Sequence, residues 1–335
     1  MSELPEFVSA LLSPVAYPEP TASVELIQTD ISFVFITDNF AYKVKKPVIY
    51  DYLDFSTREK RRYFCEREVV LNRRLCLDVY IGVVAITRDG DSIKIDGTGE
   101  TIDYAVKMMR LPADGMMDVR LEAGNVTSRD VAKIALKLAD FHAKAETGHG
   151  IDEYGTIEAV KRNCDENFAE TEKYIGLTLS KDAFNDIEQF ARGFLETNLA
   201  LFERRAKEGR IRDGHGDLHA RNIYLADDIY IYDCIEFNDK FRCGDVASEV
   251  AFLAMDLDHY GRADLSRAFV RTYVATTRDE ELLTLLGFYK CYRAYVRGKV
   301  ESLELDDPLI ESGAKQTSKS IAGSYFELAR SYTLV

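Results

Sequence analysis

The chain has 335 residues, of which 46% are hydrophobic and 30% charged, a size at which two lobes are expected rather than one core. Its formal net charge of −14 argues against a nucleic-acid partner, which needs clustered Lys and Arg. No apolar run approaches the ~18 residues of a membrane span, the six cysteines lack CxxC spacing, and the first residues lack a signal-peptide pattern, so we expect no membrane partner and a cytoplasmic location.

The N-terminal third reads as a small sheet. Residues 24–37 have the composition of two strands broken near Thr29, and residues 40–45 (FAYKVK) resume strand composition after a turn. Lys43 and Lys45 share one strand face, so either can be a cation that binds nucleotide phosphates. We choose Lys43 because Phe-Ala-Tyr-Lys has the form of the phosphate-binding Val-Ala-Ile-Lys strand. A strand Lys taken alone is more often an exposed edge charge.

A helix should follow, capped by Ser56 or Thr57 and running to about residue 75. Glu68 lies beside its apolar stripe, so it is the expected partner of the phosphate-binding Lys. Glu66 is the competitor, about 200° away around the helix, and only one of the two can face Lys43.

Residues 104–109 read as an inner strand and residues 110–112 as a hinge. The predicted lobes are therefore residues 1–110, which bind nucleotide, and residues 111–335, which carry catalysis and substrate binding. The larger lobe is expected to be helical. A capping box at residues 127–130 begins a helix on whose apolar face His142 reads as a satisfied core histidine.

Residues 215–222 (HGDLHARN) are the most informative segment. They precede two short strands, residues 222–225 and 229–232, and folding that hairpin brings Asp233 beside Asn222. An amide and a carboxylate oxygen from neighbouring strand ends suit Mg²⁺. Asp217 lies on the loop before the hairpin, where a carboxylate can orient an attacking hydroxyl.

The same loop contains His-x-Asp-x-His, which could present three ligands to Zn²⁺ in a metal-dependent hydrolase. Of the five His in the chain only three lie elsewhere, and none forms a recognisable ligand pair. We rank zinc below magnesium.

Lys290, Arg293 and Arg297 recur at spacings of three and four, so they share one helical face. This cationic stripe can clamp an anionic group of an acceptor, for which Arg is well shaped. The alternative is pairing with Asp256, Asp258 or Glu301.

The succession of Lys strand, Glu helix, His-x-Asp-x-x-x-x-Asn loop and final Asp resembles the aminoglycoside phosphotransferase-like family of the protein-kinase-like superfamily. It is most similar to a bacterial branch that carries His-Gly-Asp-Leu-His and Ile-Glu-Phe-x-x-x-Phe-Arg, here residues 235–242. The likeness runs from about residue 24 to residue 299. It implies an α+β, bilobal protein-kinase-like fold, with a small antiparallel-sheet N-lobe holding one main helix and a larger, mostly helical C-lobe.

The resemblance also implies roles for single residues: catalytic Asp217, loop-fixing His215, metal ligands Asn222 and Asp233, and phosphate-binding Lys43 with its partner Glu68. Backbone groups at the hinge, near Met109, would meet the nucleotide base. Asp245 would brace the catalytic loop. Two departures stand out. Thr29 and Ser32 occupy the place of a Gly-rich loop, so their hydroxyls would stand in for backbone groups over the phosphates. Cys234 follows Asp233 without Phe-Gly, which argues against an activation segment.

The function implied is an ATP- and Mg²⁺-dependent phosphotransferase that acts on a hydroxyl of a small molecule, with an aminoglycoside-, sugar- or amino-alcohol-like acceptor. A nucleotide-binding pseudokinase or regulatory module is the main alternative, and transfer of AMP is another. The sequence leaves ATP versus GTP, the acceptor and the oligomeric state open.

Overall fold

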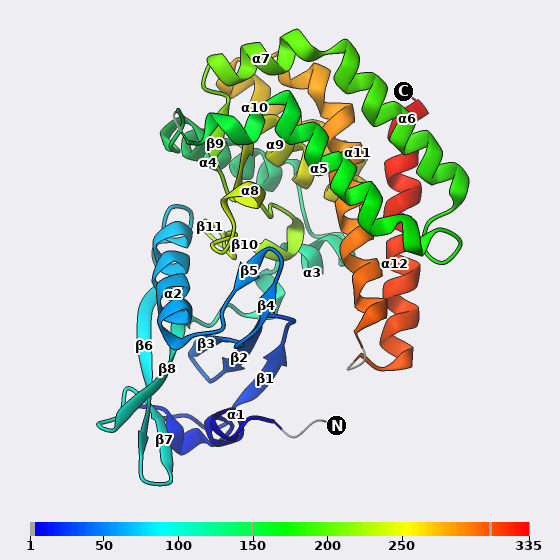
Figure 1. Ribbon diagram of the computed structural model, residues 1–335. Coiled ribbons are helices and arrows are strands. Elements are labelled where there is room, and N and C mark those ends of the chain that lie inside the picture. Colours follow the sequence, from blue (N-terminus) through cyan, green and yellow to red (C-terminus); the bar gives the residue numbers. More distant parts are fainter. Residues whose placement is uncertain (1–3, 149, 308–309, 335) are drawn as a thin grey trace. The chain divides into compact units, whose positions relative to one another are not determined.

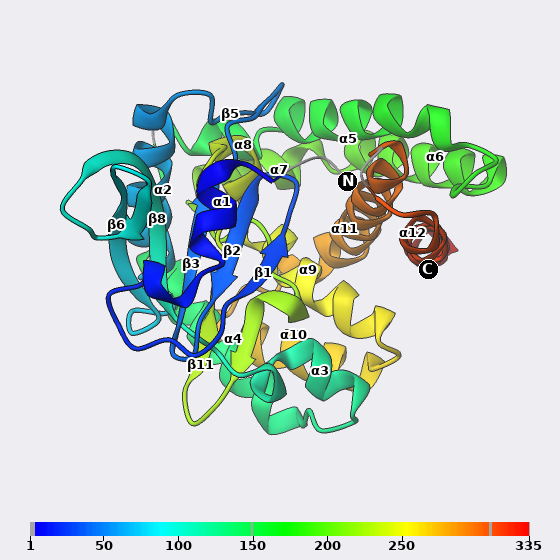
Figure 2. The same ribbon diagram turned by 90° about the horizontal axis from the view of Figure 1, so that it is seen from below.

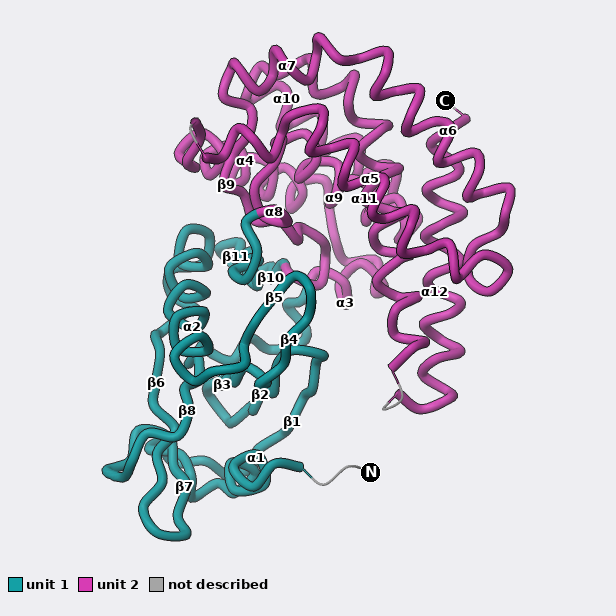
Figure 3. The backbone as a smooth tube through the Cα atoms, viewed as in Figure 1, with its two compact units in different colours: residues 1–116, 223–239 teal, residues 117–222, 240–335 magenta. Residues whose placement is uncertain are grey.

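The computed structural model describes residues 4–148, 150–307 and 310–334 (Figure 1). The chain forms two compact units, coloured separately in Figure 3: unit 1 holds residues 1–116 and 223–239, and unit 2 holds residues 117–222 and 240–335. The short segment 223–239 thus belongs to the same unit as the N-terminal sheet. The assignment of nucleotide binding to residues 1–110 and of catalysis to residues 111–335 stays a prediction.

Unit 1 is built on a six-stranded antiparallel sheet of order β1-β2-β3-β8-β6-β7. Its strands are β1 (Glu25–Gln28), β2 (Ser32–Ile36), β3 (Phe40–Lys45), β6 (Tyr80–Asp89), β7 (Ser92–Ile95) and β8 (Glu100–Met109). Strand β3 has the predicted bounds, and β8 contains the predicted inner strand between β3 and β6. A short hairpin of β4 (Ile49–Tyr50) and β5 (Leu53–Asp54) follows β3.

The two faces of this sheet carry different helices (Figure 2). Helix α1 (Glu6–Leu11) joins one face, where Tyr42 and Val44 of β3 pack in a cluster with Val8 and Leu11. Helix α2 (Arg58–Asn72) packs on the other face, mainly on β8 and β6. Because side chains alternate along a strand, Lys43 and Lys45 point to the α2 face.

Unit 1 also contains the predicted hairpin, β10 (Ile223–Leu225) and β11 (Ile229–Ile231). Ile223 pairs with Ile231, so the start of one strand lies beside the end of the other. Asn222 directly precedes β10, and Asp233 follows β11 after one intervening residue.

Unit 2 is mostly helical, as predicted. Its longer helices are α4 (Ser128–Lys144), α5 (Ile157–Thr171), α6 (Lys181–Thr197), α7 (Leu199–Lys207), α9 (Val246–His259), α10 (Ala263–Thr277), α11 (Leu282–Leu303) and α12 (Ser312–Ser331). Shorter elements are α3 (Met117–Glu122) and the strand pair β9 (Ile211–Asp213) and β12 (Cys243–Asp245), while α8 (Asp239–Arg242) begins at the last residue of unit 1. Among the residues described, no helix combines the length and apolar character that crossing a membrane requires.

Helix ends in both units follow the sequence signals. Thr127 and Asp130 form the predicted capping box of α4, with reciprocal side-chain to backbone hydrogen bonds. Helix α2 is capped by Thr57, whose hydroxyl accepts a hydrogen bond from the Lys60 amide, rather than by Ser56. Ser56 instead donates to Asp54, which removes it from the capping position.

Candidate functional site

Five charged side chains meet on the α2 face of the unit 1 sheet. Lys43 Nζ lies 2.6 Å from Asp233 Oδ1 and 3.0 Å from Glu68 Oε1. Lys45 Nζ lies 2.6 Å from Glu68 Oε2 and also contacts Glu236. We call these five residues the charge ladder, because positive and negative groups alternate from Asp233 through Lys43, Glu68 and Lys45 to Glu236.

One end of the charge ladder is buried, and the other is partly exposed to solvent. The side chains of Lys45 and Glu68 are 0% exposed, whereas those of Lys43 and Asp233 are 13% and 45% exposed. Burial alone would raise the pKa of Glu68, but the charges of Lys43 and Lys45 lower it to about 2. The carboxylates in turn hold the pKa values of both lysines above their usual range despite burial. All three groups are therefore charged at neutral pH.

Helix α2 delivers Glu68 to this cluster and turns Glu66 away. Glu68 is buried, while Glu66 lies on the exposed face and pairs with Arg62 at 2.8 Å. Of the alternatives raised by the sequence, the structure thus has Glu68 facing the lysines, and it has both lysines rather than one in contact with Glu68.

Asp233 has an unusual backbone conformation. Its φ is +62°, a region that L-residues other than Gly seldom occupy and that costs roughly 1–2 kcal/mol. Two hydrogen bonds hold the segment there: the Asp233 amide donates to Tyr80 Oη at 3.2 Å, and the Cys234 amide donates to Asn72 Oδ1 at 2.9 Å. Such strain maintained by its surroundings is common at functional sites.

The loop containing Asp217 lies in unit 2 and is internally bonded. Asn222 Nδ2 donates to Asp217 Oδ2 at 3.0 Å and to the Asp217 carbonyl at 2.9 Å. His219 Nε2 lies 3.2 Å from Asp217 Oδ2, and His215 Nδ1 accepts the Asp217 amide at 3.3 Å. Burial would raise the pKa of Asp217, but His219, Arg297 and His215 lower it well below its usual range, so Asp217 is anionic.

Two carboxylates of helix α9 anchor this loop, and the sequence analysis missed them. Glu249 Oε1 accepts the amides of His215 at 2.6 Å and Gly216 at 2.9 Å, and Asp256 Oδ2 accepts the amide of Ala220 at 2.8 Å. A signal was present: two acids seven residues apart share one face of a helix that is otherwise almost wholly apolar.

The expected brace, Asp245, has another role. Its carboxylate is bound by Arg205, which also binds Asp279, and it caps α9 through the Ala247 amide. Glu249 takes the loop-bracing role, because it lies one helical turn further along α9.

His142 is the satisfied core histidine that the sequence predicted. Its Nε2 lies 2.6 Å from Glu249 Oε2 and its Nδ1 lies 2.7 Å from Tyr273 Oη. Burial alone would raise the pKa of Glu249, but His142 and the loop amides lower it to about 2.

The cationic stripe on α11 makes contacts within unit 2. Lys290 pairs with Asp258 at 2.8 Å, and Arg297 pairs with Glu301 at 3.0 Å. Arg293 donates to Ser248 Oγ at 3.0 Å and to the Gly216 carbonyl, in the loop that contains Asp217, at 3.3 Å. Lys290 and Arg297 are thus paired with Asp258 and Glu301, as the alternative reading of the sequence expected. Arg293 contacts the loop that carries Asp217, and the charge of Arg297 lowers the pKa of Asp217.

The other residues expected to bind nucleotide differ in how they are engaged. Thr29 Oγ1 accepts the Ser32 amide at 3.0 Å and closes the turn between β1 and β2. The Ser32 side chain is buried, and its Oγ has no hydrogen-bond partner among the described residues. The Met109 amide donates to the Val79 carbonyl at 2.8 Å, while the Met109 side chain is exposed. Because the Ser32 hydroxyl is buried, its contact with a nucleotide phosphate needs a rearranged turn.

Asn222 and Asp233 carry chemistry that fits Mg²⁺. Because the Asn222 amide nitrogen is used by Asp217, its carbonyl oxygen is the atom left for a cation. Asp233 uses Oδ1 for Lys43, which leaves Oδ2. In the described part of the chain no three His, Cys, Asp or Glu side chains are grouped to hold a metal ion.

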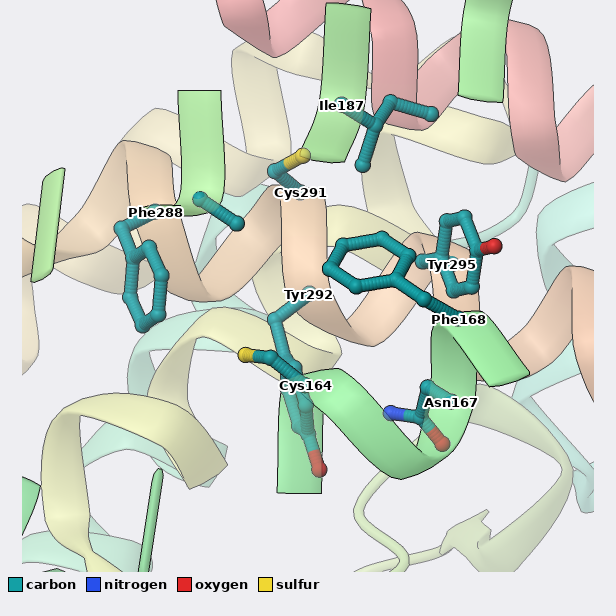
Figure 4. A pocket seen from close by; sticks show the side chains of 9 residues that line it. Cys164, Asn167, Phe168, Ile187, Phe288, Cys291, Tyr292 and Tyr295 are labelled. Carbon is teal, nitrogen blue, oxygen red and sulfur yellow. The ribbon is translucent and has the colours of Figure 1, made fainter. Parts of the chain in front are cut away.

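A small pocket between α5, α6 and α11 lies within unit 2 and is shown in Figure 4. It is lined mainly by aromatic, aliphatic and cysteine side chains, among them Cys164, Phe168, Cys291 and Tyr295. None of the residues predicted for the site lines it, so it has the character of a packing space in the helical core.

The chain is similar in sequence to mycobacterial proteins that are described as uncharacterised. No family model matches the chain. Uncharacterised proteins of Mycobacterium bovis and Mycobacterium tuberculosis are each 35% identical over 292 residues, which cover 87% of this chain and 57% of theirs. The chain therefore spans little more than half the length of the curated relatives it matches.

Solved structures give a likeness of fold. A choline/ethanolamine kinase family protein from Mesorhizobium loti matches with a TM-score of 0.54 and 11% identity, over 98% of this chain and 100% of that chain. The GDP complex of aminoglycoside 2'-phosphotransferase-IIIa matches with a TM-score of 0.51 and 12% identity, over 92% of this chain and 94% of that chain. The predicted fold class is confirmed: the chain has the α+β fold of these protein-kinase-like enzymes, with an antiparallel-sheet N-lobe and a helical C-lobe.

Proposed function

We propose that the chain is a phosphotransferase that moves the γ-phosphate of ATP, bound with Mg²⁺, to a hydroxyl of a small molecule. The observation that carries the proposal is the contact of Lys43 with both Glu68 and Asp233. Kinase-like phosphoryl transfer uses a strand Lys paired with a helix Glu, together with a nearby Asp that holds Mg²⁺. The Lys43–Glu68 pair fits the first part, and the position of Asp233 beside Lys43 fits the second. The similar structures of known small-molecule kinases support the same reaction class.

The roles of the residues follow from their chemistry. Lys43 neutralises the α- and β-phosphates, and Glu68 holds Lys43 in place. Asp217 orients the acceptor hydroxyl and receives its proton, while Asn222, through its bond to Asp217, fixes that carboxylate. Since the pKa of Asp217 is lowered, it is a weak base, so positioning contributes more to the rate than base strength. Asn222 and Asp233 would hold Mg²⁺ through their side-chain oxygens, and the ion would supply positive charge that offsets the charge of the nucleotide phosphates.

The acceptor is an alcohol, in keeping with the aminoglycoside and choline/ethanolamine kinases that share the fold. Arg297 is the member of the cationic stripe best suited to an anionic group on it. Its charge lowers the pKa of Asp217, and its buried Nε has no hydrogen-bond partner among the described residues. Arg293 is the second candidate, and Lys290 is the weakest. Lys290 and Arg297 each have an ion-pair partner, Asp258 and Glu301, but Arg297 also has the Nε without a hydrogen bond.

A thermal-shift screen of ATP and GTP with and without Mg²⁺, followed by phosphorylation of a metabolite extract, tests the proposal. A nucleotide at a hundred times its Kd should stabilise the fold by about 2.7 kcal/mol. Asp217→Asn should retain this stabilisation and lose transfer by about 10²–10⁴-fold, and Asp233→Ala should lose turnover of the metal nucleotide. Full transfer by Asp217→Asn contradicts the proposal.

The alternatives give different results in the same experiment. A binding module shows no ATP hydrolysis above that of an Asp217→Asn/Asp233→Ala double variant. Transfer of AMP adds a nucleotide rather than a phosphate to the product, which mass spectrometry distinguishes.

A further inference from the structure

We propose that Lys45 and Glu236 are positioning residues that hold Glu68 and the Asp233 segment in place independently of Lys43, so that Lys43 is free to exchange its carboxylate partners for nucleotide phosphates. This inference rests on the proposed function of the same site. It assigns a role to a second lysine and a third carboxylate, which a site with one lysine and one helix glutamate does not have.

The two oxygens of Glu68 serve different lysines. Oε1 lies 3.0 Å from Lys43 Nζ, and Oε2 lies 2.6 Å from Lys45 Nζ. Loss of the Lys43 contact therefore leaves Glu68 with a cation still bound. Without Lys45, Lys43 would be the sole counter-ion of a carboxylate that is 0% exposed, and removing it would leave an uncompensated buried charge.

Burial separates the two lysines by role. Lys45 is 0% exposed, contacts Glu236, and lies 4.9 Å from the centre of the Phe55 ring. A phosphate reaching Lys45 would have to displace both buried carboxylates. Lys43 is 13% exposed and its partner Asp233 is 45% exposed, so a ligand can reach this end of the charge ladder.

Glu236 connects the second pair to the proposed metal ligand. It lies three residues after Asp233, and both residues contact β3 lysines that are themselves two residues apart. The segment 233–236 is therefore bound to β3 at two points. When Lys43 leaves Asp233, the Lys45–Glu236 contact still holds the segment, together with the Cys234 amide bond to Asn72.

The charge count supports this division. Three carboxylates and two ammonium groups leave one negative charge in excess when all are ionised. We assign the excess negative charge to Asp233, the most exposed of the three carboxylates, because Glu68 and Glu236 are buried and both contact Lys45. An exposed carboxylate with one oxygen unused is where a cation can bind without disturbing the buried pair.

The test is the affinity for Mg²⁺-ATP, measured by calorimetry on the folded fraction of each variant. Lys45→Met should weaken binding at least tenfold, because Glu68 then competes with phosphate for Lys43. Lys45→Met/Glu236→Gln restores the net charge of the cluster but not the second cation on Glu68, so its affinity should stay low. Recovery of wild-type affinity in this double variant would mean that net charge alone acts, and it overturns the inference.

Two further measurements keep the test independent of folding defects and of the reaction. Glu236→Gln, a nearly isosteric change, should raise the Mg²⁺ concentration needed for half-maximal ATP binding several-fold, and an unchanged value overturns the inference. Labelling of Lys43 by an amine-reactive reagent, without nucleotide, should slow in Lys45→Met because Glu68 holds Lys43 more tightly. An unchanged or faster labelling rate overturns it as well.

Arg61 and Asp103 supply a matched control in the same unit. They form a buried ion pair at 2.9 Å that joins α2 to β8, outside the charge ladder. Asp103→Asn should lower stability while leaving the affinity for Mg²⁺-ATP within twofold of wild type. If Asp103→Asn weakened binding as much as Lys45→Met does, Lys45 would only support the fold in general, and the inference would be overturned. If the wild-type protein binds no nucleotide, the proposed function fails and takes the inference with it. If it binds and the Lys45 variants bind equally well, only the inference fails.

Discussion

The two units hold their candidate functional side chains by different means. In unit 1 the groups are held by other charged side chains, as Lys43 is held by Glu68 and Asp233. In unit 2 the loop that contains Asp217 is held through its backbone, by the buried carboxylates of Glu249 and Asp256. Pairs of charged side chains can exchange partners when a ligand brings new charge, whereas bonds to backbone amides fix the path of the chain. Unit 1 is therefore suited to respond to a charged ligand, and unit 2 to keep Asp217 still.

The strongest way to break this comparison is to remove the unit 2 anchor. Glu249→Ala leaves two loop amides and His142 without their buried partner, and we expect a loss of about 3–5 kcal/mol in the free energy of unfolding. Urea unfolding measures the loss. Glu188→Ala, which removes an exposed pair with Arg192, is the control and should change stability by less than about 1 kcal/mol. A Glu249→Ala protein as stable as the control would show that the loop does not depend on this anchor.

The pH dependence of the same anchor gives a somewhat smaller effect. The pKa of Glu249 is lowered from 4.5 to about 2 in the folded protein, so the unfolded chain binds this proton more tightly. The carboxylate therefore contributes its full stability, about 3 kcal/mol, above pH 4.5, and loses it as the pH falls toward 2. The difference in unfolding free energy between wild type and Glu249→Gln should be flat above about pH 5 and shrink below pH 4.5. A difference that stays constant down to pH 3 contradicts the assignment.

In unit 1 the backbone of Asp233 allows a test of smaller size. Asp233→Ala and Asp233→Gly both remove the carboxylate from Lys43, so that loss is common to the two variants. They differ in backbone preference, because a φ of +62° suits Gly but strains Ala. The Gly variant should be more stable by about 1 kcal/mol in urea unfolding. Equal stability would mean that the segment relaxes once the carboxylate is gone, and that Lys43 rather than Tyr80 and Asn72 maintains the strain.

The sequence predicted those features that depend on residues close together in the chain. Strand β3 and the capping box of α4 were predicted at the residues where they occur, because alternation and capping act over a few neighbours. The order of strand, helix, loop and hairpin carried the resemblance, and with it the fold class.

The contacts that the sequence could not give join distant residues. Lys45 and Glu236 are separated by 191 positions, and no local pattern pairs them. Period two showed that Lys43 and Lys45 share a face, but it could not show that both contact Glu68. Which of the two binds phosphate stays a prediction. Glu249 is visible as an acid on a mostly apolar helix, but its partners are not: backbone amides such as those of His215 and Gly216 leave no trace in residue type.

The smallest expected effect sharpens the assignment of α2. Glu66 and Glu68 lie on the same helix, but the Glu66 side chain is 52% exposed. Among the described residues it pairs with the exposed Arg62 at i,i+4 spacing, and such a pair contributes about 0.3–0.5 kcal/mol. Glu66→Ala should therefore change the unfolding free energy by no more than that and leave the affinity for Mg²⁺-ATP unchanged, whereas Glu68→Ala removes the shared partner of Lys43 and Lys45. Calorimetric titration of both variants measures the contrast. If Glu66→Ala weakened nucleotide binding as much as Glu68→Ala, nucleotide binding would depend on the outer face of α2. The charge ladder would then not be the phosphate-binding site.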